Sequence, residues 1–339
     1  MPGAVSSNTL PVDPIQQLTD ISCPNESICT TVGKDAKDNA AFFGTSNGGA
    51  TWVPESVSPG TPFAFTVSCP TISFCLAMGV KGVHPIMPVF VQTTDGGSQW
   101  TTNPPPDNLG NSVFYGATCS GPTACYVIQN NHVYGSTDVG VTWTSLTQAG
   151  MQIIRLVACV RAAGCLVIGT DSQGAPLFGR ILPSGTSVVR VAGLPHPKGF
   201  AFTSAELSCP SLASCTIASW KSTRILTTSD GGVRWTVRSL PASATIAGPF
   251  SCPDAKVCVI PAVSSRHSGI LLALTTTNGG ASWSLSGIAS ARTPNSNLGV
   301  SGISCPSASV CFVSDPALRQ NSVFVRRGFT SHWVQKLVK

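Results

Sequence analysis

Residues 228–235 read TSDGGVRW, and a nearly identical octapeptide, TTDGGSQW, occupies residues 93–100. Three further copies follow the same pattern, TSNGGATW at 45–52, STDVGVTW at 136–143 and TTNGGASW at 276–283, while RRGFTSHW at 326–333 keeps only the tryptophan. Six of the seven tryptophans therefore end copies of one repeated element. Self-similarity with a period of roughly 20 to 50 residues determines architecture more firmly than local propensity does.

The fourteen cysteines form a second repeat in phase with the first, always with five residues between partners. The pairs are Cys23 and Cys29, Cys69 and Cys75, Cys119 and Cys125, Cys159 and Cys165, Cys209 and Cys215, Cys252 and Cys258, and Cys305 and Cys311. The leading cysteines are 46, 50, 40, 50, 43 and 53 residues apart. Seven units of a little under fifty residues thus fill the chain.

This cysteine pattern favours disulfides over metal sites. Zinc ligands usually occur as CxxC or with nearby His and Asp partners, whereas the spacing here is five and the five histidines follow no repeat. We predict one short-range disulfide per unit, no metal and no cofactor, and an oxidising, extracellular compartment. The start MPGAVSSNTL lacks the basic and apolar regions of a signal peptide, so we expect a mature region whose export signal has been removed.

Length and charge exclude several classes of protein. A chain of 339 residues with 42% hydrophobic and 10% charged residues exceeds the usual size of one compact core. No apolar run approaches the roughly eighteen residues of a membrane-spanning helix. The net charge of +6 is spread thinly, without the clustered Lys and Arg of nucleic-acid binders. We therefore predict a radial repeat with no membrane span and no nucleic-acid partner.

Each unit contains the signals for four short strands. In the unit that starts at 209, CPSLASC is typical of a turn between two strands, and the Gly-Gly of TSDGGVRW marks a turn before a fourth strand that begins at the tryptophan. Four antiparallel strands repeated seven times predict an all-β, seven-bladed β-propeller. We expect residues 1–14 to be an N-terminal extension and residues 15–339 to form a single propeller, with blades starting near 15, 62, 112, 152, 202, 246 and 298.

At the positions Thr/Ser-x-Asp/Asn-x-Gly-x-x-Trp, the repeats resemble the BNR or Asp-box family of sialidase-like and photosystem II assembly factor-like propellers. The resemblance implies that each box is the turn between the third and fourth strands, where the Asp or Asn bonds backbone amides and a glycine supplies positive φ. It gives Asp95, Asp138 and Asp230 structural roles. The fourth unit departs from the pattern, because GRILPSGTSVV contains neither Asp nor Trp.

In an antiparallel meander, the cysteine hairpins and the boxes share one face, and the variable loops on the opposite face are the expected binding surface. Trp220, the one tryptophan outside a box, lies on such a loop beside Lys221 and Arg224, and Arg266 and His267 lie on another. An exposed indole stacks on a sugar face; the alternative is that Trp220 fills the gap between two blades. The basic residues expected on this face are Lys34, Lys37, Lys81, Lys198, Lys221, Arg224, Arg266, Arg292 and Arg319. They favour an anionic glycan or cell-surface polymer, the alternative being solvated surface charge.

A glycosidase site requires a pair of carboxyl groups roughly 5 to 10 Å apart. Asp20 and Glu206 occupy matching positions, each three residues before a leading cysteine; the alternative is that they cap or line the channel. The sequence thus favours a binding or scaffold module for carbohydrate, with protein as the other partner class. The alternative function is a glycoside hydrolase or polysaccharide lyase with its site at the mouth of the central channel, and an assembly factor rests on resemblance alone.

Overall fold

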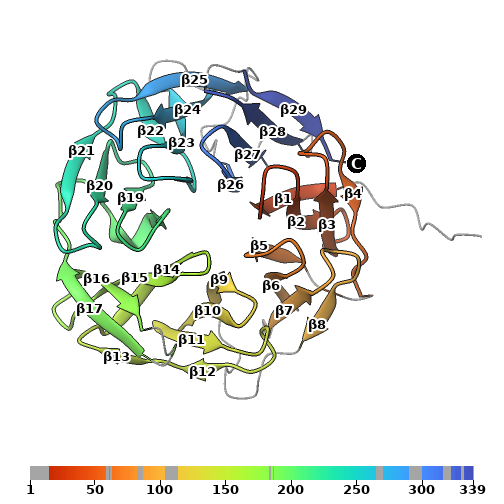
Figure 1. The fold of residues 1–339 in the computed structure, drawn as a ribbon, viewed down its shortest axis with the longest axis horizontal. Helices are drawn as coiled ribbons and strands as arrows, with labels where there is room; N and C mark the ends of the chain where they lie inside the picture. Colours follow the sequence, from red (N-terminus) through yellow and green to blue (C-terminus); the bar gives the residue numbers. More distant parts are fainter. Residues whose placement is uncertain are drawn as a thin grey trace, which may run out of the picture.

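The computed structural model describes residues 15–58, 61, 63–81, 87–103, 114–182, 185, 187–264, 270–289, 300–315, 322–329 and 332–338. Its strands form seven separate sheets arranged in a ring around a central axis, which we call the channel (Figure 1). Each sheet contains four antiparallel strands in sequence order, so the predicted seven-bladed β-propeller is confirmed. Residues 1–14 lie outside the described part of the chain.

The strands follow the chain from the channel to the rim of each blade (Figure 1). Blade 1 is β1 (Ile15–Ser22), β2 (Cys29–Asp35), β3 (Ala40–Thr45) and β4 (Val53–Pro54). Blade 2 is β5 (Ala64–Ser68), β6 (Cys75–Lys81), β7 (Met87–Thr93) and β8 (Thr101–Asn103). Blade 3 is β9 (Phe114–Gly121), β10 (Ala124–Gln129), β11 (His132–Ser136) and β12 (Thr144–Ser145).

Blade 4 is β14 (Ile153–Val160), β15 (Gly164–Thr170), β16 (Pro176–Ile181) and β17 (Ser187–Gly193), with β13 (Thr147–Ala149) added in parallel to β17 at its rim. Blade 5 follows the 3-10 turn η2 (Phe202–Ser204) and is β18 (Ala205–Ser208), β19 (Cys215–Ser219), β20 (Arg224–Thr228) and β21 (Thr236–Ser239). Blade 6 is β22 (Ala244–Ile246), β23 (Cys258–Ser264), β24 (Leu271–Thr276) and β25 (Ser284–Ala289). Blade 7 is β26 (Gly302–Ser304), β27 (Val310–Asp315), β28 (Ser322–Arg327) and β29 (Val334–Leu337).

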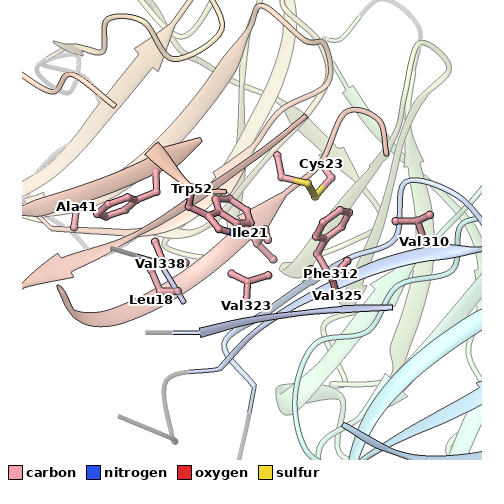
Figure 2. Packing of buried hydrophobic residues seen from close by; sticks show 12 residues of the cluster. Leu18, Ile21, Cys23, Ala41, Trp52, Val310, Phe312, Val323, Val325 and Val338 are labelled. Carbon is pink, nitrogen blue, oxygen red and sulfur yellow. A yellow bond between two sulfur atoms is a disulfide. The ribbon is translucent and has the colours of Figure 1, made fainter. Parts of the chain in front are cut away.

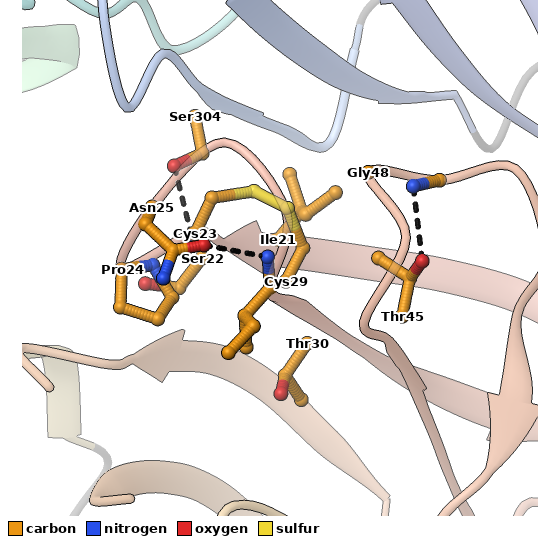
Figure 3. Close-up of a disulfide and its surroundings, with 12 residues drawn as sticks. Ile21, Ser22, Cys23, Pro24, Asn25, Cys29, Thr30, Thr45, Gly48 and Ser304 are labelled. Atoms are coloured by element: carbon orange, nitrogen blue, oxygen red, sulfur yellow. Dashed lines mark hydrogen bonds between the residues drawn. A yellow bond between two sulfur atoms is a disulfide. The ribbon is translucent and has the colours of Figure 1, made fainter. Parts of the chain in front are cut away.

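All seven predicted cysteine pairs are disulfides, and each closes the turn between the first and second strands of its blade (Figure 3). No cysteine is free. In the chain-entropy treatment, closing a loop this short stabilises the fold by about 2 kcal/mol. These stapled hairpins compensate for blades that are too small to have cores of their own.

The five complete octapeptides adopt one hydrogen-bonded turn. In blade 5, Thr228 lies opposite Cys215, and its Oγ1 donates to Asp230 Oδ1 at 2.9 Å and accepts from the N–H of Gly232 at 3.1 Å. The N–H of Arg234 also donates to Asp230 Oδ1, at 3.0 Å. The same bonds recur in the boxes at 45–52, 93–100, 136–143 and 276–283. The aspartates are therefore bound within the turns.

The boxes and the stapled hairpins lie on one face, as predicted. In blade 5 the N–H of Gly231, in the box, donates to the carbonyl of Ala213, in the cysteine loop, at 2.8 Å. Equivalent bonds join Gly48 to Ser27, Gly96 to Ser73, Gly279 to Lys256 and Gly328 to Ser309. We call this the stapled face, and the opposite side, with the second-to-third-strand turns, the loop face.

In the incomplete box of blade 7, an arginine replaces the first residue of the octapeptide. In blade 7, Arg326 lies opposite Cys311, the register position of the box threonine. Its side chain is buried, with 1% exposed, and its Nη1 donates to Thr275 Oγ1 of blade 6 at 2.8 Å. The guanidinium also lies 5.2 Å from the ring centre of Trp333. A cation–π contact thus fills the position of the missing box bonds.

The core lies between the blades. Each of the seven buried clusters combines side chains of two adjacent blades. Figure 2 shows the cluster at the ring closure, where Leu18 and Trp52 of blade 1 meet Phe312, Val323 and Val338 of blade 7. The first and last blades are complete in themselves, so side-chain packing closes the ring without an exchanged strand among the described residues.

A hydrogen bond near the channel also repeats from blade to blade. The serine before a leading cysteine accepts from the N–H of the leading cysteine in the next blade. At the ring closure, the N–H of Cys23 donates to Ser304 Oγ at 3.0 Å (Figure 3). The other four bonds join Cys69 to Ser22, Cys119 to Ser68, Cys252 to Ser208 and Cys305 to Ser251, at 2.9 to 3.2 Å. The closure therefore uses the same bond as the internal joints.

Replacing Ser304 by Ala removes the acceptor for Cys23 N–H at the closure. We expect a loss of about 1 to 2 kcal/mol in the free energy of unfolding, because the partly buried amide loses its partner. Urea unfolding followed by tryptophan fluorescence measures it. Ser309→Ala is the control, since among the described residues the Ser309 hydroxyl bonds only the nearby hydroxyl of Ser307, at 3.1 Å, and no neighbouring blade. Equal effects of the two variants would contradict the proposed role of the Ser304 hydroxyl.

For the boxes, the chain supplies its own control, because Asn47 and Asn278 make the bonds that Asp138 makes in blade 3. Asp138→Ala should lower the free energy of unfolding by about 1 to 2 kcal/mol, whereas Asp138→Asn should change it by less than about 0.5 kcal/mol. Thermal and urea unfolding test this. A loss as large for Asn as for Ala would assign the negative charge, rather than the bonding pattern, to stability.

Candidate functional site

A cavity with sequence-predicted candidates in its lining lies at the loop-face end of the channel. Its volume is about 900 Å³. The inner strands line it together with Asn131 and Trp220, which lie in the second-to-third-strand turns of blades 3 and 5. The residue three places before the leading cysteine lines it in six of the seven blades: Asp20, Thr66, Gly116, Leu156, Glu206 and Pro249. The cavity is therefore built from equivalent positions with different side chains.

On the stapled face, an arginine reaches across the channel. Arg161, in the cysteine loop of blade 4, donates through Nη1 to the carbonyl of Pro24 in the cysteine loop of blade 1. Its Nη2 lies 3.5 Å from the carbonyl of Cys23. Burial of the guanidinium lowers the pKa of Arg161. This contact joins two non-adjacent blades and narrows the channel at the end opposite the cavity.

Asp20 lines the cavity with its carboxylate fully bonded. The N–H of Ile21 donates to Oδ1 at 2.8 Å, and the N–H of Val67 and Thr66 Oγ1 donate to Oδ2 at 2.9 and 3.1 Å. Burial raises the pKa of Asp20 to about 6, against the effect of these bonds. A side chain at Gly302 would place its Cβ 2.7 Å from Oδ1, so that glycine makes room for the carboxylate. Asp20 thus ties blade 1 to blade 2 as well as lining the cavity.

Glu206 lines the same cavity from β18, and among the described residues no hydrogen bond reaches its carboxyl group. Burial raises the pKa of Glu206 to about 7, and the negative charge of Asp20 raises it further. Both residues line the same cavity. The structure therefore brings together the two residues that the sequence placed at matching positions.

Trp220 lies at the rim of this cavity, with 42% of the residue exposed, and does not fill the gap between blades. The backbone N–H of Trp220 donates to the carbonyl of Ser204 at 3.1 Å. This bond holds Trp220 beside the segment that carries Glu206. Lys221 follows with φ of 62°, and its N–H donates to the carbonyl of Ile246 in blade 6 at 3.1 Å. Lys221 and Arg224 share this turn but do not line the cavity.

The other residues predicted to bind a ligand do not gather around this cavity. Arg266 and His267 lie outside the described residues, as do Arg292 and Arg319. Lys34 forms a 2.6 Å ion pair with Asp38, which partly neutralises its charge. Among the described residues, Arg155 is the only cationic side chain that lines the cavity.

Sequence reasoning missed Glu55, which lies between blades 1 and 2. Trp100 Nε1 donates to its Oε2 at 2.7 Å, and Thr30 Oγ1 lies 3.4 Å from its Oε1. A Cβ at Gly44 or Gly97 would lie 2.2 or 2.4 Å from the carboxylate, so two glycines leave space for it. Burial raises the pKa of Glu55 to about 7, and the charge of Asp95 acts in the same direction. The only sign of Glu55 in the sequence is that a lone acid follows the short edge strand β4, and this does not reveal its partner Trp100.

A second cavity, of about 510 Å³, lies on the stapled face between the boxes of blades 5 and 6. Its carboxylates are already bonded, because Asp230 pairs with Arg234 at 3.0 Å and Asp254 accepts the N–H groups of Lys256 and Val257. Within the described ranges, no group of three His, Cys, Asp or Glu side chains could hold a metal ion. The same ranges contain no helix with the length and apolar character needed to cross a membrane.

Comparison with known proteins identifies the fold and no closer relationship. The sequence matches no protein-family model and no curated protein. Among solved structures, YCF48 bound to D1 peptide superposes with a TM-score of 0.62 at 17% identity, over 96% of this chain and 95% of that chain. YCF48 from Cyanidioschyzon merolae gives 0.61 at 16% identity, over 94% and 97%. The GH74 xyloglucanase from Xanthomonas campestris gives 0.68 at 11% identity, over 96% of this chain and 55% of that one.

The raised pKa of Glu55 predicts a pH-dependent stability. Its pKa is about 7 in the folded protein, above the ordinary value of 4.5, so its favourable contribution is complete below pH 4.5 and is lost as the pH rises through 7. We expect unfolding free energy to be lower at pH 8 than at pH 5. Glu55→Gln, which keeps an acceptor for Trp100, should reduce this difference by about 2 kcal/mol.

Urea unfolding at both pH values measures the effect, with Glu26→Gln as the control because Glu26 is exposed in a cysteine loop. Asp20 and Glu206 act in the same direction as Glu55, so part of the pH dependence should remain in the Glu55 variant. An unchanged slope in Glu55→Gln would contradict the assignment.

Proposed function

We propose that the protein is a secreted or cell-surface binding module of the Asp-box type that takes a carbohydrate chain into the channel cavity from the loop face. The observation that carries this proposal is the exposed indole of Trp220 at the rim of a cavity of about 900 Å³. A sugar ring has an apolar face that stacks on an indole and hydroxyl groups that need polar partners. The seven disulfides support an oxidising environment for such a module.

The remaining lining suits the same ligand. It combines aromatic side chains with hydroxyl groups from several blades, namely Phe65, Phe114 and Phe202 with Thr19, Thr118, Thr203, Ser204 and Ser301. Pockets that orient a ligand usually pair apolar walls with a few convergent polar groups. Residues of all seven blades line the cavity, so one ligand bound here would contact much of the ring.

A carbohydrate-active enzyme is the second candidate, favoured by the pairing of Asp20 and Glu206 in one cavity. Glycoside hydrolysis needs one carboxyl group as acid and another as base or nucleophile. Burial raises the pKa of both groups, to about 6 for Asp20 and about 7 for Glu206. However, the hydrogen bonds to Asp20 already hold both of its oxygens, which supports a structural role and places the hydrolase second.

Replacing Trp220 by Ala tests the binding proposal. Loss of the stacking surface should weaken retention of a glycan about tenfold or more, while the melting temperature stays nearly unchanged because the indole is exposed. Glycan-array binding of the wild type selects the probe, and isothermal titration compares the variants. Phe329→Ala is the control, since Phe329 is 48% exposed and follows Gly328 on the stapled face.

Three results would count against this function. A large fall in melting temperature would return Trp220 to a role in the core. Release of oligosaccharides on incubation with polysaccharides, lost in Glu206→Gln, would establish the enzyme in its place. Retention of peptides without any glycan binding would favour a protein ligand, as in the YCF48 structure that contains a D1 peptide.

A further inference from the structure

Glu206 is the one acidic group of the channel cavity with free bonding capacity among the described residues. Asp20 accepts three hydrogen bonds from blades 1 and 2. Within the same part of the chain, Glu206 accepts none, although it lines the same cavity from blade 5 and the charge of Asp20 raises its pKa. The ionised form of a buried carboxyl group that shares a cavity with another acid is unfavourable unless a cation or a donor reaches it.

No side chain of the described protein supplies that cation. Arg155, the one cationic residue in the described lining, is exposed and forms no ion pair with Asp20 or Glu206. Lys221 and Arg224 belong to the adjacent turn and do not line the cavity. A cation that pairs with the ionised form of Glu206 must therefore come from outside the described chain.

Aromatic residues line the same cavity as Glu206. Trp220 is bonded through its backbone to Ser204, two residues before Glu206, and Phe202 lies two residues further back. The faces of aromatic rings attract cations as well as the apolar faces of sugars. A cavity lined by Glu206 and by the aromatic residues Trp220 and Phe202 is therefore complementary to an ammonium group on a sugar ring.

We propose that the channel cavity selects glycans that carry free amino groups, with the ammonium bound to Glu206 near Asp20 and the sugar ring against Trp220. This inference rests on the proposed carbohydrate-binding function and specifies its ligand class. It replaces the anionic glycan expected from surface charge, because in this cavity two carboxyl groups outnumber the single guanidinium of the described lining. An anionic chain would place like charges together, whereas an amino sugar supplies the absent counter-ion.

The test uses three β-1,4-linked hexasaccharides that differ only at the second carbon of each ring: glucosamine with an amine, N-acetylglucosamine with an amide, and glucose with a hydroxyl. Isothermal titration at pH 7 and low salt compares their affinities for the full chain. We expect the glucosamine hexamer to bind about tenfold or more tightly than the other two. High salt should reduce this preference, because part of it is electrostatic.

Glu206→Gln removes the charge and keeps the shape. It should lower the affinity for the glucosamine hexamer about tenfold and leave that for the glucose hexamer unchanged. Glu26→Gln, which removes an exposed acid from the stapled face, should change neither. Because the wild-type comparison needs no variant, the proposal stays testable even if Glu206→Gln folds poorly.

The outcomes separate this inference from the function on which it rests. Equal binding of all three hexamers would keep the carbohydrate module and overturn the amine preference. A preference for glucosamine that survives in Glu206→Gln would also overturn it, since the amine would then bind elsewhere. Failure of all three hexamers and of the wider glycan array would remove the proposed function itself.

Discussion

The structure depends on a hydrogen bond between neighbouring blades at the channel wall. An inner strand exposes backbone groups at its edge, and such groups need partners. A serine hydroxyl of one blade meets the N–H of the next blade's leading cysteine, and the disulfide fixes where that N–H lies. Thr118 in blade 3 and Ala158 in blade 4 stand where the other blades have this serine. Between these two blades, the backbone N–H of Ala162 instead donates to the carbonyl of Ser120 at 2.7 Å. Among the described residues, six of the seven joints thus have a local polar contact beside their apolar cluster.

This ring turns a symmetric repeat into an asymmetric site. Equivalent positions of the blades meet around one cavity, so substitutions that are far apart in sequence become neighbours. Thr66 bonds Asp20, Gly302 gives it space, and Glu206 is left facing the cavity. On the stapled face the aspartates of the boxes accept hydrogen bonds within their own turns, so these side chains cannot be exchanged freely. The loop face is therefore where the chain can vary its chemistry without loss of the fold.

Much of the fold could be predicted because its interactions are local. A five-residue cysteine spacing and an octapeptide turn are each contained in a few residues, and both recur in phase. Contacts between blades were harder to predict. Glu55 and Arg326 are buried at blade joints, where the partners Trp100 and Thr275 lie 45 and 51 residues away. A single acid or arginine in the sequence gives no sign of such a partner.

The sequence by itself determined the number of blades, the disulfides, the boxes and the face that each turn occupies, because all of these follow from short-range spacing and the alternation of strand direction. Only the tertiary structure decided which side chains share the channel. It placed Trp220 at a rim instead of in a joint, and it paired Glu206 with Asp20, because the curvature of the closed ring brings residues of blades 1 and 5 to one cavity.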